Sequence, residues 1–147
     1  MTSVRRAAEQ DWPAIEGLLR TNGLPLAGAR HHLDTYVVAV DDEQVVATAG
    51  LEVYGDTALL RSMAVTPVRH RQGVGSLVVD AVLADAASRS LRTLYLLTTT
   101  AVDYFERRGF TQRPRASAPT ALADSEEFRG ACPASATFMA LALPERT

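Results

Sequence analysis

The 147-residue sequence contains no lysine, one cysteine and no apolar run of about 18 residues. All fifteen basic residues are therefore arginine, and the formal net charge of −2 argues against a broad polyanion-binding surface, so we expect no nucleic-acid partner. The lone Cys132 cannot form an internal disulfide, and the three histidines do not combine with it at a zinc-like spacing, so no metal is expected. Without a spanning segment or a signal-peptide core near the N-terminus, we expect a cytoplasmic protein that does not contact membranes.

The length and the 47% hydrophobic content are sufficient for one compact domain over residues 1–147. Periodicity and turn signals predict strands at 4–6, 36–40, 44–54, 57–65, 94–98, 110–113 and 135–143. Helices are predicted at 11–19, 29–33 and 101–108, and a longer one follows the glycines near 75 and continues to about 90. Single helical turns are expected within 114–122 and 124–128. Together these elements predict an α/β fold.

Local signals refine this arrangement. The turns at 41–43 and 55–56 predict an antiparallel meander of three strands. A right-handed crossover then places strand 94–98 parallel and adjacent to strand 57–65. Asp11 is the expected N-cap of the first helix, and the apolar run 94–97 is typical of a strand buried on both faces. In the longer helix, an apolar stripe of Leu77, Val78, Ala81 and Val82 is expected to pack on the sheet.

The segment 59–76 carries the strongest functional signal. It joins a predicted buried strand, a basic turn at 69–71 and two glycines, Gly73 and Gly75, at the start of a helix. The first amides of a helix lack backbone partners and carry a positive partial charge, so glycines there allow a phosphate to approach them. The segment has neither the Lys-Ser/Thr of a Walker loop nor the third glycine of a dinucleotide fingerprint. A phosphorylated cofactor other than ATP or NAD is therefore favoured.

The spacing of Pro67, His70, Gly73 and Gly75 resembles the acetyl-CoA loop of the GNAT N-acetyltransferase family. That family usually has Gln or Arg where this chain has His70, although the turn stays basic. The resemblance extends through Met63-Ala64-Val65-Thr66-Pro67 and the segment Tyr104-Phe105-Glu106-Arg107-Arg108-Gly109-Phe110. Motifs such as Gly50-Leu51-Glu52-x-Tyr54-Gly55 are similar to the small acetyltransferases encoded with arsenic-resistance genes, which act on arsinothricin, phosphinothricin and related amino acids.

The resemblance implies a single-domain fold with a mixed sheet of six to seven strands and helices on both faces. It also implies acetyl-CoA as cosubstrate, with direct transfer to an amine and no metal. The implied cofactor-binding residues are Met63, Ala64, Val65, His70, Arg71, Gln72, Gly73, Val74, Gly75 and Ser76. Because transfer is direct, no nucleophilic side chain is needed, and Cys132 is expected to be structural.

Two charged residues in apolar strands are the main candidates for chemistry. Glu52 is the candidate general base for the ammonium group, and the alternative is an exposed strand residue. Arg61 lies between Leu60 and Ser62 and must face solvent, a cleft or an ion pair. It could bind a substrate carboxylate or form a structural pair with Glu52, and both roles could hold together.

The other candidates lie later in the chain. Thr98, Thr99 and Thr100 follow a predicted parallel strand, where ligands tend to bind, and could orient an amino acid. Arg115, or less favourably Arg113, could contact a second acidic group. Tyr104 is a candidate general acid, but Phe105 occupies the position at which many family members have a tyrosine. A shift of one residue rotates a helical side chain by about 100°, so Tyr104 does not simply inherit the role.

The resulting hypothesis is an acetyl-CoA-dependent N-acetyltransferase for the α-amino group of a small acidic amino acid or its arsenic or phosphorus analogue. One alternative is a biosynthetic enzyme that makes N-acetylglutamate. The other is a CoA-binding sensor without catalysis, which the His70 and Phe105 departures keep open. A homodimer formed through the last strands is also left open by the sequence.

Overall fold

The computed structural model describes residues 2–70, 72–125, 127–131 and 135–144. The strands are β1 (Ser3–Arg6), β2 (Tyr36–Asp41), β3 (Gln44–Tyr54), β4 (Thr57–Val65), β5 (Thr93–Thr98), β6 (Thr111–Gln112) and β7 (Thr137–Ala142). The α-helices are α1 (Trp12–Thr21), α2 (Val74–Ser88), α3 (Val102–Arg107) and α4 (Thr120–Ala123). Short 3₁₀ turns are η1 (Glu9–Asp11), η2 (Arg30–Thr35), η3 (Pro67–Arg69) and η4 (Arg115–Ser117), and η5 (Glu127–Ala131) is a π-helical turn.

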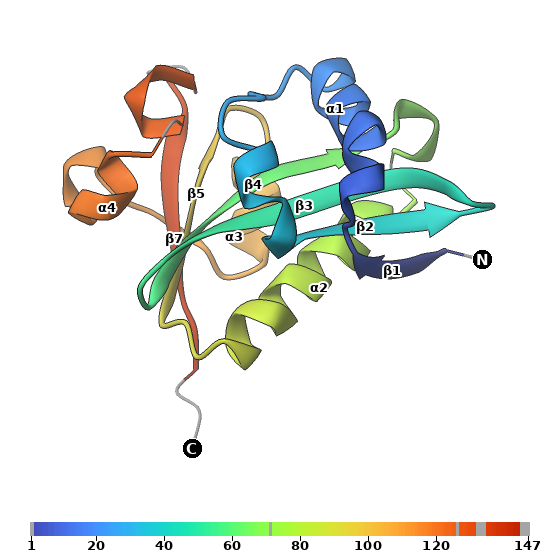
Figure 1. The fold of residues 1–147 in the computed structure, drawn as a ribbon. Coiled ribbons are helices and arrows are strands. Elements are labelled where there is room, and N and C mark those ends of the chain that lie inside the picture. Colours follow the sequence, from blue (N-terminus) through green and yellow to red (C-terminus); the bar gives the residue numbers. More distant parts are fainter. Residues whose placement is uncertain (1, 71, 126, 132–134, 145–147) are drawn as a thin grey trace. The chain divides into compact units, whose positions relative to one another are not determined.

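Within the described residues, seven strands form one sheet in the order β1-β2-β3-β4-β5-β7-β6 (Figure 1). Strand β2 is antiparallel to both β1 and β3. Strand β5 runs parallel to β4, as the crossover through α2 requires, and β7 is antiparallel to both β5 and β6. The prediction of an α/β fold with a mixed sheet is confirmed.

The chain divides into two compact units by its internal contacts. The first unit comprises Met1–Glu52 and Leu60–Asp85. Here α1 packs Ile15 and Leu19 against Tyr36 and Val38 of β2. Helix α2 lies on the opposite face of these strands (Figure 1), where Ala81 and Asp85 line a small cavity with Val37. The strands of this unit are therefore covered by helices on both faces.

The second unit comprises Val53–Leu59 and Ala86–Thr147. Its core contains stacked aromatic rings: Phe138 of β7 stacks on Tyr95 of β5 with ring centroids 5.3 Å apart, and Phe128 meets Phe138 edge-on at 5.2 Å. Gly109 ends α3 with φ of +98°, as a C-terminal glycine should. The next residue, Phe110, donates its backbone N–H to the carbonyl of Phe105, 3.0 Å away. The predicted strand at 110–113 is shorter in the structure, where β6 has two residues.

Three local predictions are corrected. Asp11 occupies the N-cap position of α1, as predicted, but makes no side-chain cap bond; its carboxylate instead accepts hydrogen bonds from Arg5 and from the Ala8 backbone N–H, both at 2.7 Å. Leu77 is 42% exposed, because the buried face of α2 includes Val78 and a side chain one residue earlier is rotated by about 100°. The apolar run in β5 is fully buried on one face only, through Leu94 and Leu96, whereas Tyr95 and Leu97 are half-buried.

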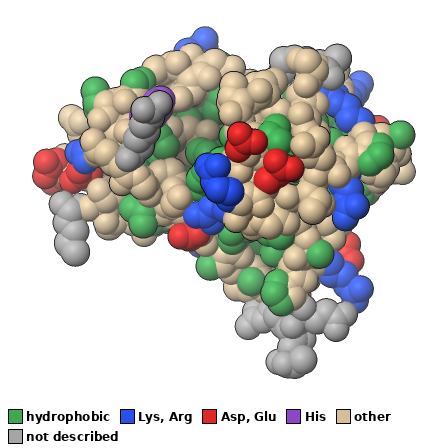
Figure 2. Space-filling model, turned by 180° about the vertical axis from the view of Figure 1, so that it is seen from behind, with side chains coloured by type: hydrophobic (Ala, Val, Ile, Leu, Met, Phe, Trp, Pro, Cys, Tyr) green, Lys and Arg blue, Asp and Glu red, His purple; other side chains and the backbone are tan. Residues whose placement is uncertain are grey.

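Arginine and acidic side chains are interspersed on the face shown in Figure 2. No helix within the described part of the chain combines the length and hydrophobicity needed to cross a bilayer.

Candidate functional site

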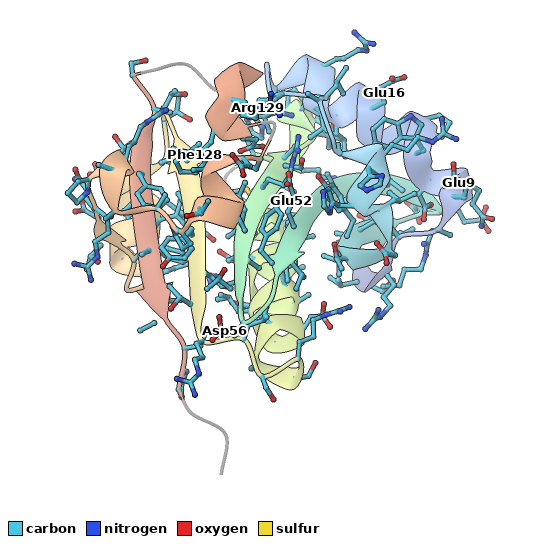
Figure 3. The ribbon with its side chains drawn as sticks, turned by 60° about the vertical axis from the view of Figure 1, so that its left-hand side comes forward. Glu9, Glu16, Glu52, Asp56, Phe128 and Arg129 are labelled. Atoms are coloured by element: carbon cyan, nitrogen blue, oxygen red, sulfur yellow. The ribbon has the colours of Figure 1, made fainter. Side chains whose placement is uncertain are left out.

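Glu52 and Arg61 form a buried ion pair between neighbouring strands of the first unit. Glu52 is near the end of β3 and Arg61 is in the middle of β4. The Arg61 Nη1 to Glu52 Oε2 distance is 2.7 Å, and the two side chains are 0% and 2% exposed. Glu52 lies within the fold, whereas Glu9 and Glu16 point away from it (Figure 3). The alternative that Glu52 is an exposed strand residue is therefore wrong.

Arg61 also donates to two backbone carbonyls of the loop that follows α1 and to the next residue of β4. Nη1 also donates to the carbonyl of Ala27 at 2.7 Å, and Nη2 donates to the carbonyl of Pro25 at 3.0 Å. Its Nε donates to the Ser62 hydroxyl at 3.1 Å. The guanidinium thus fastens the loop to β4 while it holds the carboxylate, which is the fixed multidentate geometry that arginine allows and lysine does not. The prediction that Arg61 binds a substrate carboxylate stays a prediction.

His32 is a neighbour of Glu52 that the sequence interpretation missed. It lies in η2, and its Nε2 is 3.4 Å from Glu52 Oε1. Burial lowers the pKa of His32 below its ordinary value; His31 and Arg61 act in the same direction, and Glu52 opposes it. At neutral pH the contact is therefore between a neutral imidazole and the carboxylate. The sequence signal for this neighbour was the adjacent pair His31-His32.

A backbone irregularity in β4 lies beside this pair. Ser62 has φ of +62°, an uncommon conformation for a residue other than glycine. Its hydroxyl oxygen lies 2.7 Å from the hydroxyl of Tyr36, whose side chain is fully buried. A Cβ atom on Gly50, the β3 partner of Tyr36, would lie 2.1 Å from the Tyr36 ring. Gly50 therefore leaves room for the Tyr36 ring, whose hydroxyl contacts Ser62. In the sequence, the signal for this close approach was a single glycine within a predicted strand.

The predicted cofactor loop contains two glycines, each with its own backbone constraint. Gly73 has φ of +80°, which a residue with a side chain adopts only with strain. A Cβ atom on Gly75 would lie 3.3 Å from the side chain of Val65 and 3.7 Å from the sulfur of Met63, so the start of α2 lies against the end of β4. His70 contacts that strand too, with Nε2 at 2.9 Å from the Val65 carbonyl oxygen.

The other predicted loop residues surround these contacts. Ala64 is buried, Gln72 is exposed, and Val74 and Ser76 belong to the first turn of α2. Arg71 lies outside the described residues. Among the described residues, the exposed large hydrophobic side chains are Val68, 79% exposed, and Leu77. Both flank the loop, and the sequence interpretation assigned neither of them to a site.

The remaining candidates belong to the second unit. The Thr98 hydroxyl accepts a hydrogen bond from the Ala101 backbone N–H at 3.0 Å and so supports the turn into α3, while Thr99 and Thr100 are exposed. Arg115 donates to the carbonyl of Ala136 at 3.1 Å and lies over the Phe128 ring. Cys132 is outside the described residues.

Tyr104 and Phe105 face different surroundings on α3. The half-buried Tyr104 ring lies 5.3 Å from the guanidinium of Arg108. Phe105 is 4% exposed and contacts Phe110 at 5.4 Å between ring centroids. The Phe105 side chain therefore serves the core of the second unit. Among the described residues, no group of His, Cys, Asp or Glu side chains has an arrangement that could hold a metal ion.

Comparison with known proteins finds similar sequences among amino-acid acetyltransferases. An amino-acid acetyltransferase of Mycobacterium tuberculosis is 31% identical over 120 residues, which are 74% of this chain and 68% of that protein. The amino-acid acetyltransferase of Pasteurella multocida is 27% identical over 117 residues, or 74% of this chain. The chain spans 27% of that protein's length, about a quarter.

Two solved structures share the fold. N-acetylglutamate synthase from Neisseria gonorrhoeae, complexed with coenzyme A and N-acetyl-glutamate, has a TM-score of 0.85 at 20% identity, covering 99% of this chain and 36% of that chain. A Mycobacterium tuberculosis protein in complex with CoA and a second ligand has a TM-score of 0.82 at 26% identity, covering 97% and 99% of the two chains. A family profile described as an acetyltransferase (GNAT) domain matches residues 32–112, more than half of the sequence, so the chain belongs to this acetyltransferase family.

Proposed function

We propose that this protein transfers the acetyl group of acetyl-CoA directly to the α-amino group of an amino acid. The observation that carries the proposal is the glycine loop: Gly73 with positive φ and Gly75 against Val65 open a fifteen-residue helix at the end of β4. Such a helix start suits a diphosphate. The relatives named amino-acid acetyltransferase and the CoA complex of the mycobacterial protein support the same cosubstrate and acceptor class.

In this proposal the cofactor lies along β4 and the loop. The backbone of Met63, Ala64 and Val65 pairs with the pantetheine arm, and His70, Arg71, Gln72, Gly73, Val74, Gly75 and Ser76 surround the diphosphate. The exposed Val68 and Leu77 offer apolar surface on either side of that loop. His70 contributes by holding the loop to the Val65 carbonyl, so the departure from Gln or Arg is compatible with cofactor binding.

The reaction requires a neutral amine close to the thioester carbonyl. Glu52 accepts a proton from the ammonium group, the amine nitrogen attacks the acetyl carbon, and the carbon–sulfur bond breaks. The electron pair leaves on the CoA sulfur, which is protonated by Tyr104 or by water. The nitrogen loses its second proton as the amide forms, and that proton replaces the one given by Tyr104 or water. Arg61 keeps the Glu52 carboxylate at a fixed position, with one carboxylate oxygen bound to its Nη1.

The preferred acceptor in this proposal is a small acidic amino acid or its arsenic or phosphorus analogue, with detoxification as the role. Arg61, Thr98, Thr99, Thr100 and Arg115 are the proposed substrate-binding residues. The support is the sequence resemblance to the acetyltransferases encoded with arsenic-resistance genes. The relatives named amino-acid acetyltransferase fit both this acceptor and the alternative, namely formation of N-acetylglutamate. A catalytically silent CoA sensor is the third candidate.

The test measures free thiol released from acetyl-CoA with arsinothricin, phosphinothricin, glutamate, other amino acids and polyamines, followed by the mass of the product. A higher kcat/KM for the toxic analogues than for glutamate supports detoxification, and the reverse order supports biosynthesis. Thiol release without an acetylated amine, or none with any amine despite acetyl-CoA binding, contradicts the proposed transfer. Glu52→Gln should lower kcat at neutral pH by about 100-fold or more if Glu52 is the base.

A further inference from the structure

Glu52 is buried, so the proton that it accepts in the proposed reaction needs a route to solvent. A base whose side chain is 2% exposed cannot exchange its proton readily with bulk water. Each turnover transfers one proton from the ammonium group to the base, and that proton must leave before the next cycle. One of the Glu52 oxygens is occupied by the buried Arg61, which cannot accept a proton.

The other oxygen, Oε1, faces His32. The separation is 3.4 Å from His32 Nε2, and hydrogen bonds of catalytic groups are often this long before substrate binds. The His32 side chain is 24% exposed, so part of it reaches solvent while its Nε2 lies beside the buried carboxylate. Imidazole can accept a proton at one nitrogen and release one from the other. His32 therefore has both the position and the chemistry for proton transfer.

The backbone around His32 is fastened so that this contact is maintained. The Thr35 hydroxyl lies 2.9 Å from the carbonyl oxygen of His32 and also contacts the carbonyl of Leu51, the residue before Glu52. His32 itself interrupts the regular geometry of η2, with φ of −105° and ψ of 18°. Its backbone N–H donates to the carbonyl of Ala29 at 3.1 Å. These contacts tie the histidine backbone to the strand that carries Glu52.

We propose that His32 is the positioning and proton-transfer residue through which the proton accepted by Glu52 reaches solvent. For this step the neutral ring carries its hydrogen on Nδ1, so that Nε2 is the acceptor. The Glu52 O–H bond breaks as the proton moves to His32 Nε2, and the resulting imidazolium loses the Nδ1 proton to water. Proton exchange with water then returns the ring to its starting tautomer. No oxidant or further reactant is needed. The inference rests on the proposed acetyl transfer, because it assigns the fate of the proton in that reaction.

The charges around the imidazole suit a temporary proton carrier. Glu52 on β3 and Asp34 on η2 favour the imidazolium, whereas burial, Arg61 on β4 and the adjacent His31 disfavour it. The balance lies toward the neutral ring, since the pKa of His32 is lowered. A neutral ring is the form that can accept a proton from Glu52 at neutral pH.

The kinetic test compares His32→Gln with His31→Gln, a matched change at the exposed neighbouring imidazole. With the best amine from the substrate panel, His32→Gln should lower kcat by about tenfold or more at neutral pH, while the KM for acetyl-CoA stays within twofold. Added imidazole should restore part of the lost kcat, and His31→Gln should remain within twofold of wild type. A kcat for His32→Gln within twofold of wild type, or a loss that imidazole does not rescue, would overturn the proposal.

A second measurement reads the contact without activity. Nuclear magnetic resonance titration of the histidine rings should give a lower pKa for His32 in Glu52→Gln than in wild type, because the neutral amide cannot stabilise the imidazolium. An unchanged His32 titration would also overturn the proposal. A third outcome separates this inference from the proposed function. If Glu52→Gln changes the His32 titration but wild type acetylates no amine, the contact between His32 and Glu52 is supported and the proposed function fails.

Discussion

Replacing Arg61 with methionine should destabilise the folded protein by about 3–5 kcal/mol, because it leaves the buried charge of Glu52 without its cation. The same change removes the donors that bind the carbonyls of Pro25 and Ala27, and each lost hydrogen bond contributes about 1 kcal/mol. These contributions share one side chain and do not add fully. The expected loss is a large part of the 5–15 kcal/mol by which domains are typically stable.

The measurement is urea unfolding followed by the fluorescence of Trp12, the single tryptophan of the chain, together with far-ultraviolet circular dichroism. The matched control is Arg20→Met, because Arg20 is 65% exposed and its ion pair with Glu16 lies on the surface. That control should change the unfolding free energy by less than about 1 kcal/mol. Glu52→Gln combined with Arg61→Met should be more stable than Arg61→Met alone by about 1–3 kcal/mol, since the uncompensated charge is gone.

Two results would refute this reasoning. If Arg61→Met unfolds within about 1 kcal/mol of wild type, the pair does not hold the loop in place. If the double variant is no more stable than Arg61→Met, the cost is not the unpaired charge of Glu52. A stable Arg61→Met protein with a raised KM for the amino acid and an unchanged KM for acetyl-CoA would instead support the role of Arg61 as a substrate ligand.

Three further changes test separate features. Gly75→Asp should weaken acetyl-CoA binding by tenfold or more in calorimetry, because it adds a side chain and a negative charge at the helix start where the diphosphate is expected to bind; unchanged affinity in the folded variant would refute the loop assignment. Gly50→Ala should destabilise the protein by about 1–3 kcal/mol in urea, since the new Cβ would meet the Tyr36 ring, and a neutral effect would remove that constraint. Asp11 has a pKa lowered mainly by its hydrogen bond from Arg5, so its contribution to stability is present above pH 3.8 and is lost as the pH falls through the lower folded value. Wild type should therefore lose more stability than Asp11→Asn on acidification below about pH 4, and parallel curves would contradict this.

The sequence was sufficient to predict the strands that build the centre of the sheet. The bounds of β3 and β4 agree with the predicted 44–54 and 57–65, because a two-residue turn between two β-rich segments leaves little freedom in register. The parallel pairing of β5 with β4 followed from the handedness of the crossover. These features depend on local residue types and on one general rule of chain topology.

The burial of individual side chains was harder to predict. Leu77 matches the helical stripe, yet it is exposed because the part of α2 that faces the strands depends on how the helix is rotated. In β5, Tyr95 and Leu97 are apolar but half-buried, since hydrophobic side chains also occur on partly covered faces. Residue type constrains which side chains can be buried, whereas the packing of whole elements decides which of them are.

The surroundings of Glu52 were beyond sequence reasoning for a different reason. Arg61 was identified as an anomaly because a charge within an apolar strand needs a partner, and Glu52 was the partner considered. Its other partners are the backbone carbonyls of Pro25 and Ala27, and Thr35 likewise contacts the carbonyls of His32 and Leu51. Every residue has a carbonyl, so such an acceptor carries no sequence signal. A sequence shows which side chains can donate hydrogen bonds. Which backbone segment each donor binds is known only from the folded structure. Here those contacts hold the loop before η2 and the turn itself, and His32 of η2 lies beside the buried Glu52 carboxylate.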